Sequence, residues 1–240
     1  SLEEIVKKLE DLNKKAVEIL RRVLEEHEKL VEKVKKVLRD VLRLLEKVVR
    51  EVIETLKKGD TDEKTREALK ELEEVVRKIK EEVEKVLKRL EEVSKRLKDE
   101  VRRVLKESED VAKKIRRDVR GVRSEDAAKR ATDLLKETLT ILEEAIRRIV
   151  KVIEDSLEIL REAVEAIVRL LEELLSILAR IGLDEEVLRK LKEIIKELKD
   201  RLKKLLDDYE RIIDELRAEL ERVLREYEKI LEDLRKELED

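Results

Sequence analysis

Apolar residues recur at fixed spacings through nearly the whole chain, and this periodicity is the strongest constraint on its fold. Two series in residues 2–55 each advance by seven positions. They are Leu2, Leu9, Ala16, Val23, Leu30, Val37, Leu44 and Val6, Asn13, Leu20, His27, Val34, Val41, Val48, Thr55. A third series widens the stripe and consists of Val17, Leu24, Val31, Leu38, Leu45 and Val52. A sustained seven-residue repeat predicts helices with left-handed supercoiling, and the width of the stripe favours a four-helix bundle.

The same repeat recurs later in the chain, and three glycines interrupt it. The later series is Thr132, Leu139, Ile146, Ile153, Leu160, Ile167, Leu174 and Ile181. Gly59, Gly121 and Gly182 divide the chain into segments of 58, 61, 60 and 58 residues. We expect each glycine to end a helix in the left-handed conformation, where the absence of a Cβ removes the steric cost.

A helix-start signal follows each glycine and also opens the chain. We expect Asp60 (with Glu63 reaching back), Ser124 and Asp184 to be N-caps, and Ser1 to form a capping box with Glu4. The predicted helices cover residues 2–58, 61–120, 125–181 and 184–239. Connections this short make consecutive helices antiparallel. The sequence therefore predicts an all-α, single-domain, up-down-up-down four-helix bundle over residues 1–240, about 85 Å long at the rise of an α-helix.

The composition excludes several classes of function. The chain is 52% charged and 41% apolar, which is typical of long helices. Its 61 basic and 64 acidic residues nearly balance, so we expect no nucleic-acid partner. The absence of cysteine excludes disulfides, thiolate catalysis and zinc–thiolate sites. No apolar run is long enough to span a bilayer, so we expect a soluble protein without a membrane partner, and the natural location stays unknown.

Capped helices of matched length, connections centred on glycine, charged surfaces and a core of Leu, Ile and Val resemble de novo designed helical bundles. The resemblance extends over the whole chain and is specific to this class. It implies an idealised scaffold, with room for designed hydrogen-bond networks in its core, and it implies no substrate. A natural tethering coiled coil would normally contain Gln, Met, Phe or Trp, and all four are absent here.

His27 is the only histidine and the first candidate for chemistry. A metal site needs several converging ligands, and general acid–base catalysis needs a pocket with a second positioned group. Neither the Glu-x-x-His signature of di-iron bundles nor the HExxH pattern is present, because Leu24 precedes His27 by three residues and Val31 follows it by four. We therefore expect a buried, neutral imidazole held by hydrogen bonds, and we expect no metal, no cofactor and no enzyme activity.

Other polar residues on the apolar series point to the same interpretation. In a helical hairpin that turns near Gly59, the numbers of facing residues add up to about 121, as they do for His27 with Ser94 and for Asn13 with Ser108. In a hairpin that turns near Gly182 they add up to about 365, as they do for Thr138 with Tyr227 and for Ser156 with Tyr209. The predicted buried polar layers are Asn13, Ser108, Thr138, Tyr227 in one case and His27, Ser94, Ser156, Tyr209 in the other.

The two layers do not align fully, since they are 14 residues apart in the first hairpin and 18 in the second, a difference of about 6 Å. At least one layer must be staggered, with a tyrosine side chain reaching across. Buried tyrosine hydroxyls usually have hydrogen-bond partners. The alternative is that both tyrosines edge the core with their hydroxyls in water.

The basic run KKIRRDVRGVR at residues 113–123 could bind phosphate or nucleic acid. Its position at a helix C-terminus offers a simpler explanation, because cations there complement the helix dipole. No aromatic residues lie within the run to stack on bases.

We therefore predict a structural scaffold whose buried polar layers specify helix register and pairing, with no required partner. A monomer is favoured and an oligomer is possible. The alternative is an interaction module, one component of a designed oligomer. It rests on an unusually wide apolar face of the third helix, which includes Ala145, Val152, Ile159 and Ala166.

Overall fold

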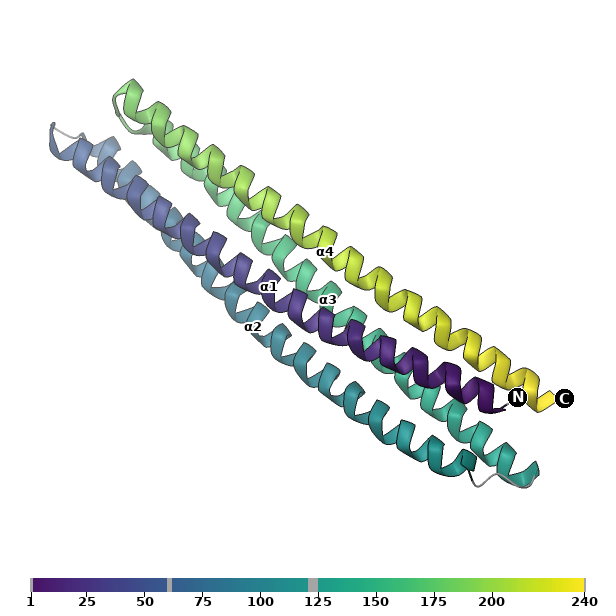
Figure 1. Cartoon of the computed structure of the whole chain (residues 1–240). Coiled ribbons are helices and arrows are strands. Elements are labelled where there is room, and N and C mark those ends of the chain that lie inside the picture. Colours follow the sequence, from purple (N-terminus) through teal and green to yellow (C-terminus); the bar gives the residue numbers. More distant parts are fainter. Residues whose placement is uncertain (1, 60–61, 121–124, 240) are drawn as a thin grey trace. The chain divides into compact units, whose positions relative to one another are not determined.

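A computed structural model of the chain describes residues 2–59, 62–120 and 125–239, and it is an all-α four-helix bundle as predicted (Figure 1). The helices are α1 (Leu2–Lys57), α2 (Glu63–Arg120), α3 (Glu125–Arg180) and α4 (Glu185–Glu239). Their bounds differ little from the predicted ones.

The start of α2 differs from the prediction. Asp62 is its N-cap, because the backbone N–H of Thr65 donates to Asp62 Oδ1 at 2.9 Å and the N–H of Arg66 donates to the Asp62 carbonyl at 3.2 Å. Hydrogen bonds from the side chain and from the backbone N–H of Thr65 lower the pKa of the Asp62 carboxyl. With Asp62 as N-cap, the third helical position is Thr65, so Glu63 cannot complete a capping box.

The other predicted caps have different outcomes. The Asp184 carbonyl accepts the first hydrogen bond of α4 from the N–H of Leu188 at 2.9 Å, which confirms Asp184 as the residue at the N-cap position. Ser1, Asp60, Gly121 and Ser124 lie outside the described residues.

The helix ends at Gly59 and Gly182 also differ from the prediction, since neither glycine has a positive φ. Instead the last turn of each helix tightens, with the N–H of Gly59 donating to the Leu56 carbonyl and the N–H of Ile181 donating to the Leu178 carbonyl. Such i→i+3 bonds satisfy terminal carbonyls without a left-handed residue. The N–H of Leu183 then donates to the Ile181 carbonyl at 2.8 Å, which forms a tight turn around Gly182.

The buried residues repeat every 18 positions rather than every seven. In α1 the fully buried set includes Leu9, His27 and Leu45, and in α4 it includes Leu191, Tyr209 and Tyr227. One predicted seven-residue series stays buried from Val6 to Val48, whereas in the other Val37 and Leu44 are only half-buried while Leu38 and Leu45 are buried. This repeat corresponds to five turns of an undistorted helix. Such a period requires no supercoil, and the left-handed supercoiling expected from the sequence stays a prediction.

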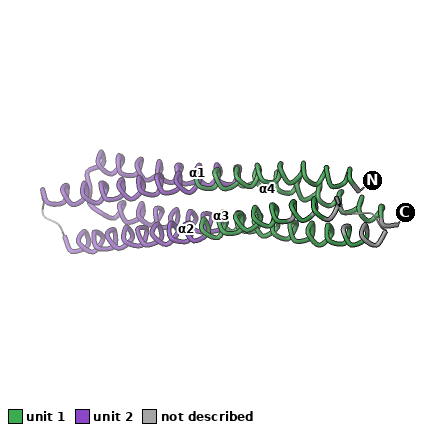
Figure 2. The backbone as a smooth tube through the Cα atoms, turned by 60° about the horizontal axis from the view of Figure 1, so that its bottom comes forward, with its two compact units in different colours: residues 1–28, 93–155, 212–240 green, residues 29–92, 156–211 purple. Residues whose placement is uncertain are grey.

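The chain divides into two compact units that all four helices enter (Figure 2). Unit 1 comprises residues 1–28, 93–155 and 212–240, and unit 2 comprises residues 29–92 and 156–211. α1 and α3 run from unit 1 into unit 2, whereas α2 and α4 run from unit 2 into unit 1. Consecutive helices are therefore antiparallel.

Ion pairs show which helices are neighbours within each unit. In unit 1 these are Arg116–Glu10 (α2–α1), Arg148–Glu100 (α3–α2), Arg147–Glu228 (α3–α4) and Arg22–Glu219 (α1–α4). In unit 2 they are Lys35–Glu91 (α1–α2), Arg89–Glu162 (α2–α3), Arg161–Glu210 (α3–α4) and Lys33–Asp208 (α1–α4). Each unit is thus a closed ring in the order α1, α2, α3, α4, the neighbour order of an up-down-up-down bundle.

We predict that Gly59→Ala and Gly182→Ala leave the protein as stable as before or stabilise it by about 0.4–1 kcal/mol each. An added Cβ would meet no heavy atom within 4 Å at either position, and neither residue needs a positive φ. Chemical denaturation of each variant measures the effect. A loss of about 1 kcal/mol would instead show that these glycines adopt the left-handed conformation.

Candidate functional site

The contact between Tyr227 and Asn13 joins α4 to α1 in the core of unit 1. Tyr227 Oη donates a hydrogen bond to Asn13 Oδ1 at 2.7 Å, and the tyrosine is 1% exposed. The sequence predicted both residues for one buried polar layer, and the structure brings them into direct contact. The tyrosine bonds across to α1 rather than to Thr138, its predicted partner in the α3–α4 hairpin.

The contact between Tyr209 and Ser156 joins α4 to α3 in the core of unit 2. Tyr209 Oη donates to Ser156 Oγ at 2.9 Å, and both residues are 0% exposed. This is one of the pairs predicted from the second hairpin. The alternative that the tyrosines edge the core with their hydroxyls in water is therefore wrong for both of them.

Burial raises the pKa of both tyrosine hydroxyls, because a phenolate is poorly solvated in the core. The pKa of Tyr209 rises to about 12, with the hydrogen bond to Ser156 partly opposing the shift. The pKa of Tyr227 is also raised well above its usual range. Both side chains are thus neutral donors at all physiological pH values.

The repeat of buried positions explains why the two tyrosines use different partners. Tyr209 and Tyr227 are one 18-residue repeat apart on α4, and Ser156 and Thr138 are one repeat apart on α3. Thr138 therefore has the same place relative to Tyr227 as Ser156 has relative to Tyr209, and both carry a small hydroxyl side chain. On α1 the position one repeat after Asn13 is Val31, which is buried and has no side-chain acceptor. Tyr209 therefore bonds to Ser156, whereas Tyr227 finds an acceptor on α1.

His27 is buried, as predicted, with 1% of its surface exposed. Burial lowers the pKa of its imidazole to about 4, and the nearby Glu28 carboxylate only partly offsets this. The imidazole is neutral at physiological pH. His27 lies in unit 1 whereas Ser156 and Tyr209 lie in unit 2, so the four-residue layer proposed for them stays a prediction.

The other predicted layer residues lie close to the core. Ser108 and Thr138 are buried in unit 1, and Ser108 lines the same surface groove as Asn13. Ser94 is half-buried, and its Oγ is buried without a hydrogen-bond partner among the residues that the structure describes. Ser94 Oγ therefore makes no hydrogen bond to His27, and the layer that contains both residues stays a prediction.

Sequence reasoning missed one buried ionisable residue, Glu143 of α3, which is 9% exposed. Its Oε1 is buried and makes no hydrogen bond within the described part of the chain. Burial raises the pKa of this carboxyl, and Glu228 raises it further, while Arg147 and Arg235 act in the opposite direction. Its position beside Leu142 on the apolar side of the helix was the available signal, but charged residues border apolar stripes throughout this sequence.

The wide apolar face of α3 is largely covered by the chain itself. Ala145 and Val152 are buried, and Ile159 and Ala166 are half-buried. Among the described residues, Ile141 is the one large apolar residue that is exposed, at 49%. These positions therefore provide little surface for the interaction module considered above.

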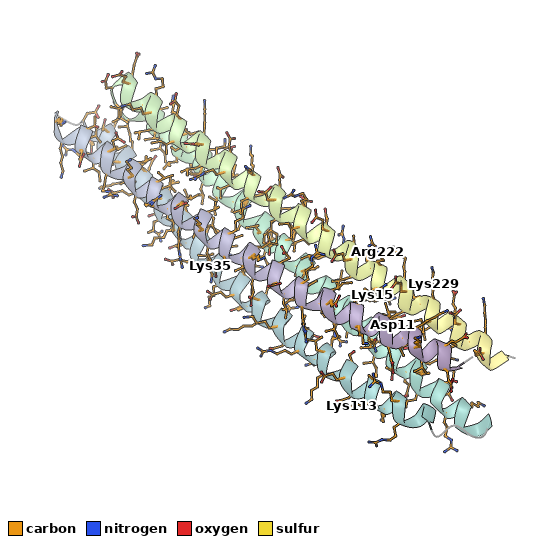
Figure 3. The ribbon with its side chains drawn as sticks, in the orientation of Figure 1. Asp11, Lys15, Lys35, Lys113, Arg222 and Lys229 are labelled. Carbon is orange, nitrogen blue, oxygen red and sulfur yellow. The ribbon has the colours of Figure 1, made fainter. Side chains whose placement is uncertain are left out.

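Shallow grooves with charged rims follow the seam between α1 and α4 in unit 1. Asp11, Lys15 and Lys229 line one groove, and Lys15, Arg222 and Glu226 line the next (Figure 3). Acidic and basic side chains are equally numerous in each lining, so neither groove carries a net charge that would attract an anion. Within the basic run, Lys113, Lys114, Arg116 and Arg117 are exposed on α2, and Arg116 pairs with Glu10 at 2.9 Å, while positions 121–123 of the run lie outside the described residues.

No protein-family model matches the chain, and no curated protein is significantly similar to it. Within residues 2–59, 62–120 and 125–239, no three His, Cys, Asp or Glu side chains form a group that could hold a metal ion. In that same part of the chain, no helix has an apolar stretch sufficient to cross a bilayer.

We predict that acid destabilises the protein through His27. The unfolded chain binds the proton near pH 6.5, whereas the folded chain binds it only near pH 4. The contribution to stability is therefore complete above pH 6.5 and falls as the pH drops to 4, by about 3 kcal/mol in total. Denaturation at several pH values, with an NMR titration of the single imidazole, measures both quantities.

His27→Leu is the matched control, because it removes the titrating group and keeps an apolar side chain at the position. This variant should be about as stable as the parent protein near neutral pH. Its free energy of unfolding should not show the fall between pH 6.5 and pH 4 that is predicted for the parent. An imidazole that titrates at or above pH 6.5 in the folded protein would contradict the buried, neutral state.

Proposed function

We propose that this chain is a designed structural scaffold whose buried polar contacts select helix pairing and register. The observation that carries the proposal is the use of its two tyrosines. Each donates its hydroxyl, in the core, to a small polar side chain on a neighbouring helix. The scaffold acts as a monomer and needs no metal, cofactor, nucleic acid or membrane for this role.

The native register and a shifted register differ in whether the buried tyrosine hydroxyl has a hydrogen-bond partner. A buried hydroxyl without a partner costs about 1–3 kcal/mol, whereas the same group with a partner is close to neutral or slightly favourable. If α4 slid by one turn along α1, Tyr227 would face Leu9 or Val17, which lie one turn before and one turn after Asn13, instead of the Asn13 amide. Apolar packing alone discriminates less well between the native and the shifted register, because Leu and Val recur at every turn of the helices.

A designed origin is supported by the regular spacing of the buried positions and by the matched lengths of the helices. The buried positions keep the same period in all four helices, for example Leu72, Leu90 and Ser108 in α2 and Leu135, Ile153 and Leu171 in α3. The helices are 56, 58, 56 and 55 residues long. Idealised helices of matched length with minimal connections are typical of designed backbones.

A double-mutant cycle at Tyr227 and Asn13 tests the proposal. We expect Tyr227→Phe to lower the free energy of unfolding by about 1–3 kcal/mol, because it leaves Asn13 Oδ1 without its partner. Asn13→Leu should cost a similar amount. The double variant should regain most of the stability, because an apolar pair replaces a polar one.

The readout that concerns function is conformational uniqueness. We expect the double variant, despite its stability, to give more than one set of backbone resonances in an NMR spectrum. Val31→Leu, one repeat after Asn13, is the control and should keep a single set. A stable double variant with a single set of sharp resonances would show that the contact does not specify the register.

A further inference from the structure

A groove opens between α1 and α2 in unit 1 and leads to the Tyr227–Asn13 contact. Its volume is about 340 Å³, within the range of small-molecule sites. Asn13 and Ser108 supply its polar lining, and Val17 and Ala112 supply apolar walls. α1 and α2 are neighbouring helices here, as the Arg116–Glu10 ion pair and Figure 1 show.

The groove exists because two residues of α2 are unusually small. The positions one and two repeats before Ser108 are Leu90 and Leu72, whose side chains fill the corresponding places on the same stripe. Ala112, one turn after Ser108, lies on the same side of the helix and adds only a methyl group. The missing side-chain volume leaves space over the amide of Asn13.

The polar lining offers hydrogen-bond donors. Asn13 Oδ1 already accepts from Tyr227, so the remaining capacity of this amide is the two N–H groups on Nδ2. The Ser108 hydroxyl can also donate. Neither group makes a hydrogen bond to another residue within the part of the chain that the structure describes. A ligand atom that accepts hydrogen bonds would satisfy both.

The charged rim favours an uncharged ligand. Three acidic residues, Glu10, Glu18 and Glu109, face three basic ones, Lys14, Arg21 and Arg116, around the groove. Glu10 and Arg116 neutralise each other directly at 2.9 Å. A ligand with a net charge would lose hydration without meeting an excess of opposite charge.

We propose that this groove binds a small uncharged aromatic molecule that carries a hydrogen-bond acceptor. The ring packs between Val17 and Ala112, and the acceptor receives hydrogen bonds from Asn13 Nδ2 and the Ser108 hydroxyl. This site is independent of the scaffold role proposed above, since it uses only the donors that the Tyr227 contact leaves free.

Benzamide is a suitable probe, and the sequence provides a direct reporter. Asn13 is the only asparagine and the chain has no glutamine, so its side-chain NH₂ gives the one pair of carboxamide cross-peaks in a ¹H–¹⁵N spectrum, called the Asn13 signal below. We expect benzamide to shift this signal in a saturable way, with a Kd of about 1–10 mM for a ligand of this size. Benzoate and benzylammonium should bind at least about threefold more weakly because they carry a charge.

Variants locate the site. Ala112→Leu should fill the groove and weaken binding at least about tenfold, and Ser108→Ala should weaken it about threefold to tenfold through loss of one donor. Ser108→Leu is a second filling variant, since Leu90 and Leu72 already occupy equivalent positions. Ala166→Leu, also at a half-buried alanine but in unit 2, should leave binding unchanged.

Two results would overturn the proposal. The first is the absence of a saturable shift of the Asn13 signal up to about 50 mM benzamide, or an unchanged shift in folded Ala112→Leu and Ser108→Leu. The second is binding of benzoate or benzylammonium as tight as that of benzamide, which would rule out selection for an uncharged ligand.

Discussion

Each helix keeps one stripe of side chains away from water along nearly all of its length, and the other features depend on this burial. A fully buried Leu, Ile or Val contributes about 1.5–3 kcal/mol, whereas an exposed ion pair contributes about 0–1 kcal/mol. The apolar stripe therefore determines how the helices face one another, and the ion pairs around each ring add little. Because the buried positions recur after five whole turns, the stripe stays on one side of an undistorted helix.

Polar groups on the buried stripe are costly unless they are paired, and this cost gives them their effect on specificity. Tyr209, Tyr227 and His27 occupy positions where other turns of the same helices carry Leu, Ile or Val. In the observed alignment each tyrosine hydroxyl donates to a partner on a neighbouring helix. On the function proposed above, these contacts penalise alternative registers that the apolar residues would tolerate.

The sequence predicted the four helices, the burial of His27 and the pairing of Tyr209 with Ser156, since each follows from periodicity and short connections. It did not reveal the longer period of the buried positions, because two turns of an undistorted helix span about 7.2 residues and differ little from a seven-residue repeat until Val37 and Leu44. The sequence also placed Tyr227 and Asn13 in one layer, but the pairing rule for hairpins favoured Thr138 as the partner of Tyr227, whereas the structure has Asn13 on α1 as its acceptor. Asp60 and Asp62 are both good N-cap residues, so composition alone could not choose between them.

The most direct test of the account is a spectrophotometric titration of the tyrosines, with helicity followed by circular dichroism. The chain has two tyrosines and no tryptophan, so the phenolate absorbance reports on Tyr209 and Tyr227 alone. With the pKa of Tyr209 at about 12 and that of Tyr227 also raised, at most about a tenth of the signal should appear by pH 11 while the protein stays helical. Ionisation near pH 10 in the helical protein would show that the hydroxyls are solvated, and the buried contacts that we propose to select the register would then be absent.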